Sequence, residues 1–193
     1  MDYQYDVFFS YKRDRESDGW HERVKDKVAH WLKQELQKLE VRIFFDTEEI
    51  HTGMRWQLRI EDALRHSRCI LCVWSPLYFQ SKWCVSEWKT FLEREKQAKR
   101  ELILPASYFD GETYPTSAKE RQILDFSEFA CTMPKFWETE SAVTFEKLRL
   151  KPFAKALAEI IRSAPVFDPN FPIIQAQDDE VESEKTIGRP ADD

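Results

Sequence analysis

Glycine is scarce in this chain of 193 residues: it occurs only at positions 19, 53, 111 and 188, and no two glycines lie close together. Loops that cradle phosphates need several glycines within one short segment. The sequence therefore excludes a dinucleotide-binding fingerprint and a phosphate-binding P-loop. A phosphate would have to be met by helix N-termini and by the cations Lys12, Arg13, Arg55 or Lys82.

Cysteine is also rare, with single residues at 69, 72, 84 and 131. Cys69 and Cys72 have the spacing of a metal or redox pair, but they lie in an apolar run, where strand residues three apart point to opposite faces. No second pair and no histidine cluster completes a zinc-binding set. We therefore expect small buried cysteines in a reducing compartment, with no metal and no cofactor.

No apolar run approaches the roughly 20 residues that a membrane helix needs. The N-terminus has no basic region followed by an apolar core, so we expect no secretory signal, no membrane association and a cytoplasmic protein. The formal net charge of −6 arises in residues 168–193, which carry eight acidic and two basic side chains. Because the rest of the chain is formally neutral, we expect no nucleic-acid partner.

Apolar runs alternate with segments of helical periodicity along the chain. This alternation is typical of a parallel sheet covered by helices on both faces. We therefore expect an α/β, flavodoxin-like three-layer fold with a parallel five-stranded sheet of order 2-1-3-4-5. The expected strands cover residues 5–10, 41–45, 69–74, 101–105 and 123–129, and the expected helices cover residues 20–39, 55–66, 82–100 and 145–161.

The chain changes character after residue 164, where prolines at 165, 169 and 172 interrupt it and a polar, acidic stretch follows. We expect one domain over residues 1–164 and a C-terminal tail over residues 165–193, the last part of which is disordered. Residues 108–137 are rich in aromatic side chains, which could cover the edge of the sheet or form a partner surface.

The clearest chemical signal follows the most apolar run, residues 69–74. Trp83 and Glu87 lie four residues apart at the start of an expected helix, so they share one helix face. In open α/β sheets, ligands bind outside the carboxyl ends of the strands. An aromatic ring beside a carboxylate at this edge could hold a nucleoside and act on its glycosidic bond. Ser81 is equally well placed as an N-cap. We expect the four histidines, at 21, 30, 51 and 66, to lie on the surface.

Four blocks of sequence, in this order and with suitable gaps, resemble a TIR (Toll/interleukin receptor) domain of the bacterial kind. They lie within residues 5–11, 45–56, 60–67 and 75–87. The resemblance covers roughly residues 3–160 and implies a flavodoxin-like fold. It also implies one of two functions, because some TIR domains are adaptors that associate with other TIR domains. Others cleave NAD⁺ at the nicotinamide–ribose bond and release ADP-ribose or a cyclised isomer.

The resemblance assigns roles to particular residues. Glu87 matches the catalytic glutamate of a Trp-x-x-x-Glu motif, and Trp83 would stack against a ring of the substrate. One glutamate suffices because nicotinamide departs neutral from a cationic state and needs no proton. Residues 46–53 match the family's BB loop. The implied substrate-binding residues are Trp83, Phe9, Ser10, Tyr11, Arg13, Asp46, Gly53, Arg55 and Ser81.

The sequence resembles in particular the TIR subunits of Thoeris-type antiphage defence, which make a cyclic ADP-ribose-type messenger for a separate effector. This resemblance implies NAD⁺ as substrate and self-association through TIR–TIR contacts. Two alternatives stay open. One is a non-enzymatic adaptor or virulence factor that acts through TIR–TIR association. The other is an enzyme similar to nucleoside deoxyribosyltransferases, which also use a glutamate on this type of fold.

Overall fold

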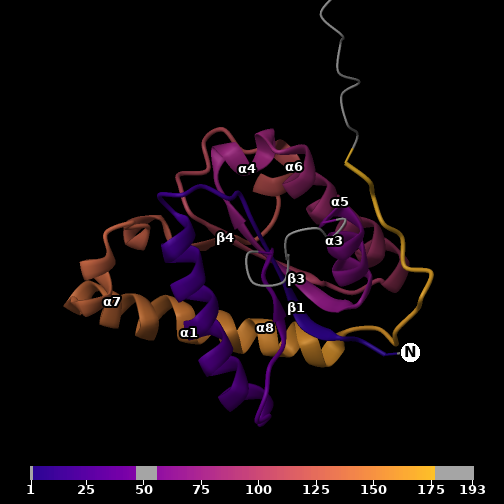
Figure 1. Ribbon diagram of the computed structural model, residues 1–193, viewed down its shortest axis with the longest axis horizontal. Helices are drawn as coiled ribbons and strands as arrows, with labels where there is room; N and C mark the ends of the chain where they lie inside the picture. The colour runs from indigo at the N-terminus through magenta and orange to yellow at the C-terminus, as the bar shows by residue number, and fades with distance from the viewer. Residues whose placement is uncertain (1, 47–55, 177–193) are drawn as a thin grey trace, which may run out of the picture.

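A computed structural model describes residues 2–46 and 56–176 of the chain. Five parallel strands form one sheet in the order β2-β1-β3-β4-β5, which confirms the flavodoxin-like topology expected from the sequence (Figure 1). The strands are β1 (Tyr5–Tyr11), β2 (Ile43–Phe44), β3 (Ser67–Trp74), β4 (Ile103–Ser107) and β5 (Leu124–Asp125).

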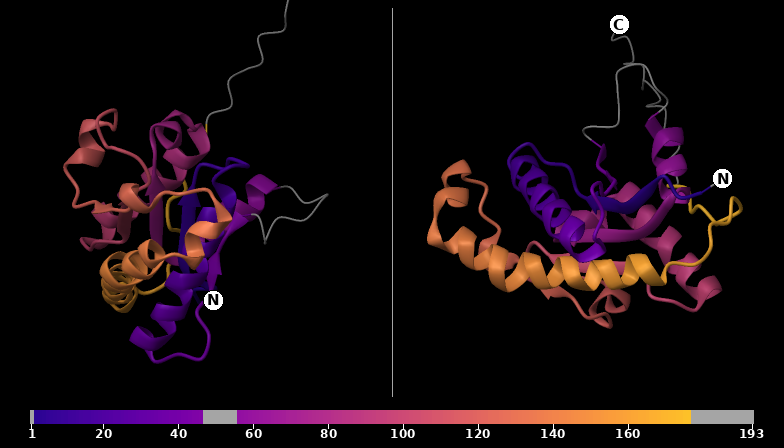
Figure 2. Two further views of the ribbon diagram at one scale, coloured as in Figure 1. Left: turned by 90° about the vertical axis from the view of Figure 1, so that its left-hand side faces the viewer. Right: turned by 90° about the horizontal axis from the view of Figure 1, so that it is seen from below.

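Helices cover both faces of this sheet (Figures 1 and 2). On one face α1 (Asp18–Leu36) packs beside α8 (Lys151–Ser163), and on the other face lie α3 (Trp56–Arg65) and α5 (Lys82–Ala98). No helix in the described parts of the chain is long and apolar enough to cross a membrane. The shorter helical pieces are α4 (Pro76–Gln80), α6 (Thr116–Lys119), η1 (Ser127–Phe129), η2 (Pro134–Glu138) and α7 (Glu140–Phe145).

Successive strand residues divide between two cores. In β1, Val7 and Phe9 pack into the core under α1 and α8, whereas Phe8 packs into the core under α3 and α5. The two cysteines of β3 follow the same alternation, because Cys69 lies in the first core and Cys72 in the second. Both thiols are free and buried, as their place in an apolar run predicted.

Several boundaries differ from the sequence prediction for local reasons. Helices α1 and α5 end before the expected residues 39 and 100, because Gln37 and Lys99 adopt left-handed backbone angles with φ of 53° and 52°. Strand β2 is shorter than expected because it lies at the edge of the sheet and pairs only with β1. Strand β5 is likewise an edge strand of two residues.

The closing helix is broken into pieces, where the sequence predicted one helix over residues 145–161. A π-helical turn, η3 (Glu146–Leu150), separates α7 from α8. Pro152 occupies the first turn of α8 and has no amide hydrogen to donate to the preceding turn. The helical hydrogen-bond pattern therefore changes at this point.

The aromatic segment 108–137 mostly covers the β5 end of the sheet. Phe126 is fully buried and packs edge-on against Phe145, and Phe136 is buried near the same ring. Phe109 is different, because 53% of its surface is exposed. The aromatic content of this segment is thus explained largely by an extension of the core.

Residues 165–176 lie against the domain rather than away from it. The Tyr3 hydroxyl donates a hydrogen bond to the Pro165 carbonyl at 3.0 Å, and the Ile174 amide donates to Thr90 Oγ1 of α5 at 2.9 Å. Between these points, Phe171 is buried under the guanidinium of Arg94, which lies 4.3 Å from the ring centroid. This segment, drawn in yellow beside α5 in Figure 1, therefore belongs to the folded unit.

We expect Phe171→Ala to lower the free energy of unfolding by about 2–4 kcal/mol, because it removes a buried ring and leaves a cavity beside Arg94. Val166→Ala in the same segment is the matched control, since 91% of Val166 is exposed. Urea unfolding followed by circular dichroism measures both. Equal stabilities for the two variants would show that the segment does not stabilise the domain.

Candidate active site

Helix α5 places Glu87 and Trp83 at the carboxyl edge of the sheet. The helix begins after Ser81, whose extended backbone and side-chain oxygen cap it by accepting a hydrogen bond from the Cys84 amide at 3.4 Å. Ser81 thus has the structural role that its position allowed. Glu87 and Trp83 lie one turn apart on the helix.

The carboxyl group of Glu87 is buried, with 7% of the residue exposed. Ser10 of β1 donates a hydrogen bond from its Oγ to Glu87 Oε2 at 2.6 Å. The same Oγ lies 2.7 Å from the Tyr78 hydroxyl. The serine hydroxyl has one hydrogen, and it is used in the hydrogen bond to Glu87. The Tyr78 hydroxyl must therefore be the donor in the hydrogen bond to Ser10. A chain of two hydrogen bonds therefore runs from Tyr78 through Ser10 to Glu87.

Burial raises the pKa of Glu87 to about 8, against an ordinary value of 4.5. The Ser10 hydrogen bond opposes this effect, and the negative charge of Asp46 adds to it. Glu87 is thus largely protonated at neutral pH in the free protein. A cationic ligand beside it would favour the carboxylate, because an opposite charge lowers the pKa of a carboxyl group.

A second group of side chains joins the ends of β1 and β2. The Tyr11 hydroxyl donates to Asp46 Oδ1 at 3.0 Å, and Arg13 Nε lies 3.7 Å from Asp46 Oδ2. The Tyr11 ring stacks on Phe45 with the centroids 4.9 Å apart. Burial and the neighbouring Asp46 carboxylate raise the pKa of Tyr11 well above its ordinary value, so its hydroxyl remains a donor.

Two tryptophans form an aromatic surface one helical turn from Glu87. The rings of Trp83 and Trp56 have centroids 4.5 Å apart at an interplanar angle of 58°. Trp83 is half-buried and 40% of Trp56 is exposed, so neither ring belongs to the interior. Aromatic faces that remain accessible to solvent can stack on the flat rings of a ligand.

The structure brings together some of the predicted site residues and separates others. Ser10 contacts Glu87 directly, and Tyr11, Arg13 and Asp46 form one connected group. Phe9 packs edge-on against the Tyr11 ring, with the centroids 5.7 Å apart, but it lies away from Glu87. It points to the opposite face of the sheet from Ser10 and packs edge-on against Phe45, with the centroids 5.4 Å apart. Gly53, Arg55 and residues 47–53 of the predicted 46–53 loop lie outside the described residues. Of that loop, the structure describes Asp46 alone.

Two residues of this site, Tyr78 and Trp56, did not receive a role from the sequence. Tyr78 is on α4, which lies outside the helices expected from the sequence. Its signal was nevertheless present, because Ser75 followed by Pro76 is a common helix start, and the Ser75 side chain does accept from the Tyr78 amide at 3.2 Å. No sequence signal indicated that Trp56 would meet Trp83.

The expectation for the histidines was wrong at His21. Only 3% of His21 is exposed, and its ring lies 4.6 Å from the Tyr11 ring, centroid to centroid. The helical period of α1 places it on the face that packs against the sheet.

The cluster of residues that a metal would need is absent from the described part of the chain, where no group of three His, Cys, Asp or Glu side chains could hold an ion.

Comparison with known proteins identifies the family. A family model described as "TIR domain" matches residues 7–135, which is more than half of the chain. The chain therefore belongs to the TIR domain family.

Curated relatives match over about half of this chain. "Disease resistance-like protein CSA1" of Arabidopsis thaliana is 32% identical over 96 residues, which are 50% of this chain and 7% of that protein. "Probable 2' cyclic ADP-D-ribose synthase BdTIR" of Brachypodium distachyon is 29% identical over 106 residues, 51% of this chain and 47% of that protein. The matched part thus spans less than half the length of either relative.

Two solved structures are similar at low sequence identity. The TIR domain of the Toll-related receptor TRR-2 from Hydra magnipapillata is 20% identical, with a TM-score of 0.48, over 75% of this chain and 99% of that one. The TIR domains of the activated Roq1 resistosome are 24% identical, with a TM-score of 0.42, over 81% of this chain and 85% of that one.

We expect Glu87→Gln to stabilise the protein increasingly as pH rises. The unfolded carboxyl ionises near pH 4.5 and the folded one near pH 8, so the wild type loses stability between these values and Gln does not. The difference in unfolding free energy should grow by about 3–5 kcal/mol from pH 4.5 to pH 9. Urea unfolding at both pH values measures it, with Glu93→Gln on the same helix as control. A difference that does not change with pH would contradict the buried carboxyl.

Proposed function

We propose that this chain is an NAD⁺ glycohydrolase and ADP-ribosyl cyclase that breaks the nicotinamide–ribose bond. The observation that carries the proposal is a buried glutamate, hydrogen-bonded by Ser10, one helical turn from the half-buried Trp83 at the carboxyl edge of the sheet. Membership of the TIR family supports it, as does similarity to the Brachypodium relative, which is named a probable 2' cyclic ADP-D-ribose synthase.

The reaction needs one carboxylate and no general acid. The nicotinamide ring of NAD⁺ is cationic, so its approach to Glu87 favours ionisation of the buried carboxyl group. As the glycosidic bond breaks, the bonding electrons leave with neutral nicotinamide, and the ribose becomes oxocarbenium-like. The Glu87 carboxylate stabilises that positive charge in a site with little water. Attack by water gives ADP-ribose and a proton, whereas attack by a nucleophile within the same molecule gives a cyclic product.

The aromatic pair bears on the choice between these products. The accessible ring face of Trp83, supported by the tilted ring of Trp56, can stack on a second ring of the substrate and bring it back toward the ribose. Cyclisation needs such a folded conformation, because the internal nucleophile must reach the ribose before water does. We therefore assign Trp83 a substrate-stacking role and Glu87 the catalytic one.

The wider role follows from the resemblance to Thoeris-type TIR subunits. In this proposed role, the cyclic product is a messenger for a separate effector in bacterial antiphage defence. Activity depends on self-association through TIR–TIR contacts. NAD⁺ is a substrate here, so no resident cofactor is required. Assays at high protein concentration suit an enzyme that works as an assembly.

We expect Glu87→Gln to reduce nicotinamide release at least about 100-fold, the usual cost of removing charge stabilisation from a transition state. Chromatographic quantification of nicotinamide measures this, and Glu93→Gln on the same helix is the control.

The wild-type kcat/KM should rise with pH up to about 8, because it reports the ionisation of Glu87 in the free enzyme. In Ser10→Ala this rise should shift to higher pH, since the hydrogen bond that favours the carboxylate is lost.

An unchanged rate in Glu87→Gln would overturn the assignment of the catalytic residue. A wild-type protein that releases no nicotinamide, even at high concentration, would instead favour the adaptor function. Turnover of deoxynucleosides in place of NAD⁺ would favour the deoxyribosyltransferase alternative.

We expect Trp83→Ala to lower the ratio of cyclic to linear product while NAD⁺ cleavage continues. Removal of the ring takes away the stacking surface but leaves the Glu87 carboxyl group in place. Mass spectrometry of the products after chromatography measures the ratio. Trp83→Phe should restore part of it, because a smaller aromatic face remains. The same product ratio in all three proteins would exclude a stacking role.

A further inference from the structure

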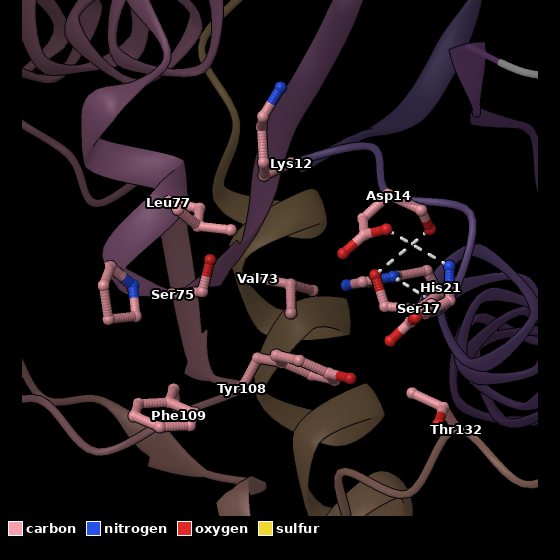
Figure 3. A pocket seen from close by; sticks show the side chains of 12 residues that line it. Lys12, Asp14, Ser17, His21, Val73, Ser75, Leu77, Tyr108, Phe109 and Thr132 are labelled. Carbon is pink, nitrogen blue, oxygen red and sulfur yellow. Dashed lines mark hydrogen bonds between the residues drawn. The ribbon is translucent and has the colours of Figure 1, made fainter.

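A cavity lies on the other side of β1 from Glu87. Its volume is about 270 Å³, and its walls come from the segments that follow β1, β3 and β4, represented by Lys12, Ser75 and Tyr108 (Figure 3). These strands are neighbours in the sheet, and the strand order reverses between β1 and β3. Ligands of open α/β sheets bind at such a point, outside the carboxyl ends of the strands.

His21 contributes an unused hydrogen-bond acceptor to this cavity. Its Nδ1 lies 2.8 Å from the Ser17 carbonyl oxygen, which can only accept, so the proton is on Nδ1. Burial lowers the pKa of His21 to about 4, which keeps the ring neutral and Nε2 without a proton. No partner for Nε2 is found among the residues that the structure describes, and Figure 3 shows the far side of the ring directed into the cavity.

The surroundings of His21 favour a flat ligand. The His21 ring lies between those of Tyr11 and Tyr108, at centroid distances of 4.6 Å and 5.2 Å. Further apolar surface comes from Val73 and from two exposed side chains, Leu77 and Phe109, at 51% and 53% exposure. Large apolar side chains exposed beside a cavity are common at ligand-binding sites.

Size and charge narrow the class of ligand. A volume of about 270 Å³ is just below the range of about 300–1,000 Å³ for small-molecule pockets, so it suits one ring system rather than a whole dinucleotide. The walls carry two carboxylates, Asp14 and Glu16, against one ammonium group, Lys12. This balance disfavours an anionic group and favours a neutral one.

We propose that this cavity binds a neutral nitrogen heterocycle with an exocyclic amino or carboxamide group, which donates a hydrogen bond to His21 Nε2. The ring lies against Tyr108 and the apolar wall. An adenine base and free nicotinamide both have this chemistry. The site is separate from Glu87 and does not depend on NAD⁺ cleavage, so it adds a binding function to the proposed enzyme.

Titration of the full chain with adenosine and with nicotinamide, followed by NMR, tests the proposal. Matched analogues lack the donor: purine riboside has no amino group, and nicotinic acid is an anion. We expect saturable binding of adenosine, nicotinamide or both, and at least about tenfold weaker binding of the corresponding analogue. Which of the two binds identifies the source of the heterocycle.

Variants locate the binding site. His21→Phe retains an aromatic ring but removes the acceptor, and it should weaken binding at least about tenfold. His30→Phe, the same change on the exposed side of α1, should not. Tyr108→Leu is a second test should His21→Phe not fold, and it should also weaken binding. Val166→Ala, at an exposed position of the C-terminal segment, should also leave the affinity unchanged.

The proposal is overturned if neither compound binds saturably. It is also overturned if each analogue binds as well as its parent compound, that is, purine riboside as well as adenosine and nicotinic acid as well as nicotinamide. A third contrary result is binding that Trp83→Ala abolishes and that His21→Phe and Tyr108→Leu do not weaken. Nicotinamide release from NAD⁺ by the same preparations separates the two proposals. Binding without cleavage would overturn the proposed enzyme alone, and cleavage without binding would overturn this cavity alone.

Discussion

The hydrogen bond from Ser10 to Glu87 is the interaction on which the site depends. It joins β1, an inner strand of the sheet, to the second turn of α5, and through the Tyr78 hydroxyl it also reaches α4. A buried carboxyl group without a partner would be costly to the fold. One neutral donor makes burial tolerable without forcing ionisation, so Glu87 remains poised to respond to a nearby cation.

The alternation of side chains along β1 divides the carboxyl edge of the sheet into two regions. Ser10 faces α5 and donates a hydrogen bond to Glu87, while its neighbour Tyr11 faces α1 and contacts His21. A period of two in an extended strand makes this separation unavoidable. One short segment of chain can therefore line an acidic site on one side and an aromatic cavity on the other.

Much of the fold could be predicted because the buried strands have a simple pattern. Continuous apolar runs such as β3 indicated a sheet covered on both faces, and the alternation with helices indicated its order. Helix ends were harder to predict, since the left-handed residues that end them, Gln37 and Lys99, are not glycines. The contact of residues 165–176 with α5 was also hidden, because prolines and polar residues suggested a tail that leaves the domain.

By itself, the sequence determined that Trp83 and Glu87 share a helix face after a buried strand, since helical spacing is a local property. It also excluded a glycine-rich phosphate loop. Only the tertiary structure decided that Ser10 is the partner of Glu87, that Tyr78 supports Ser10, and that Phe9 points away from them. These relations join residues about 70 positions apart, and the pKa of Glu87 depends on the burial that their packing creates.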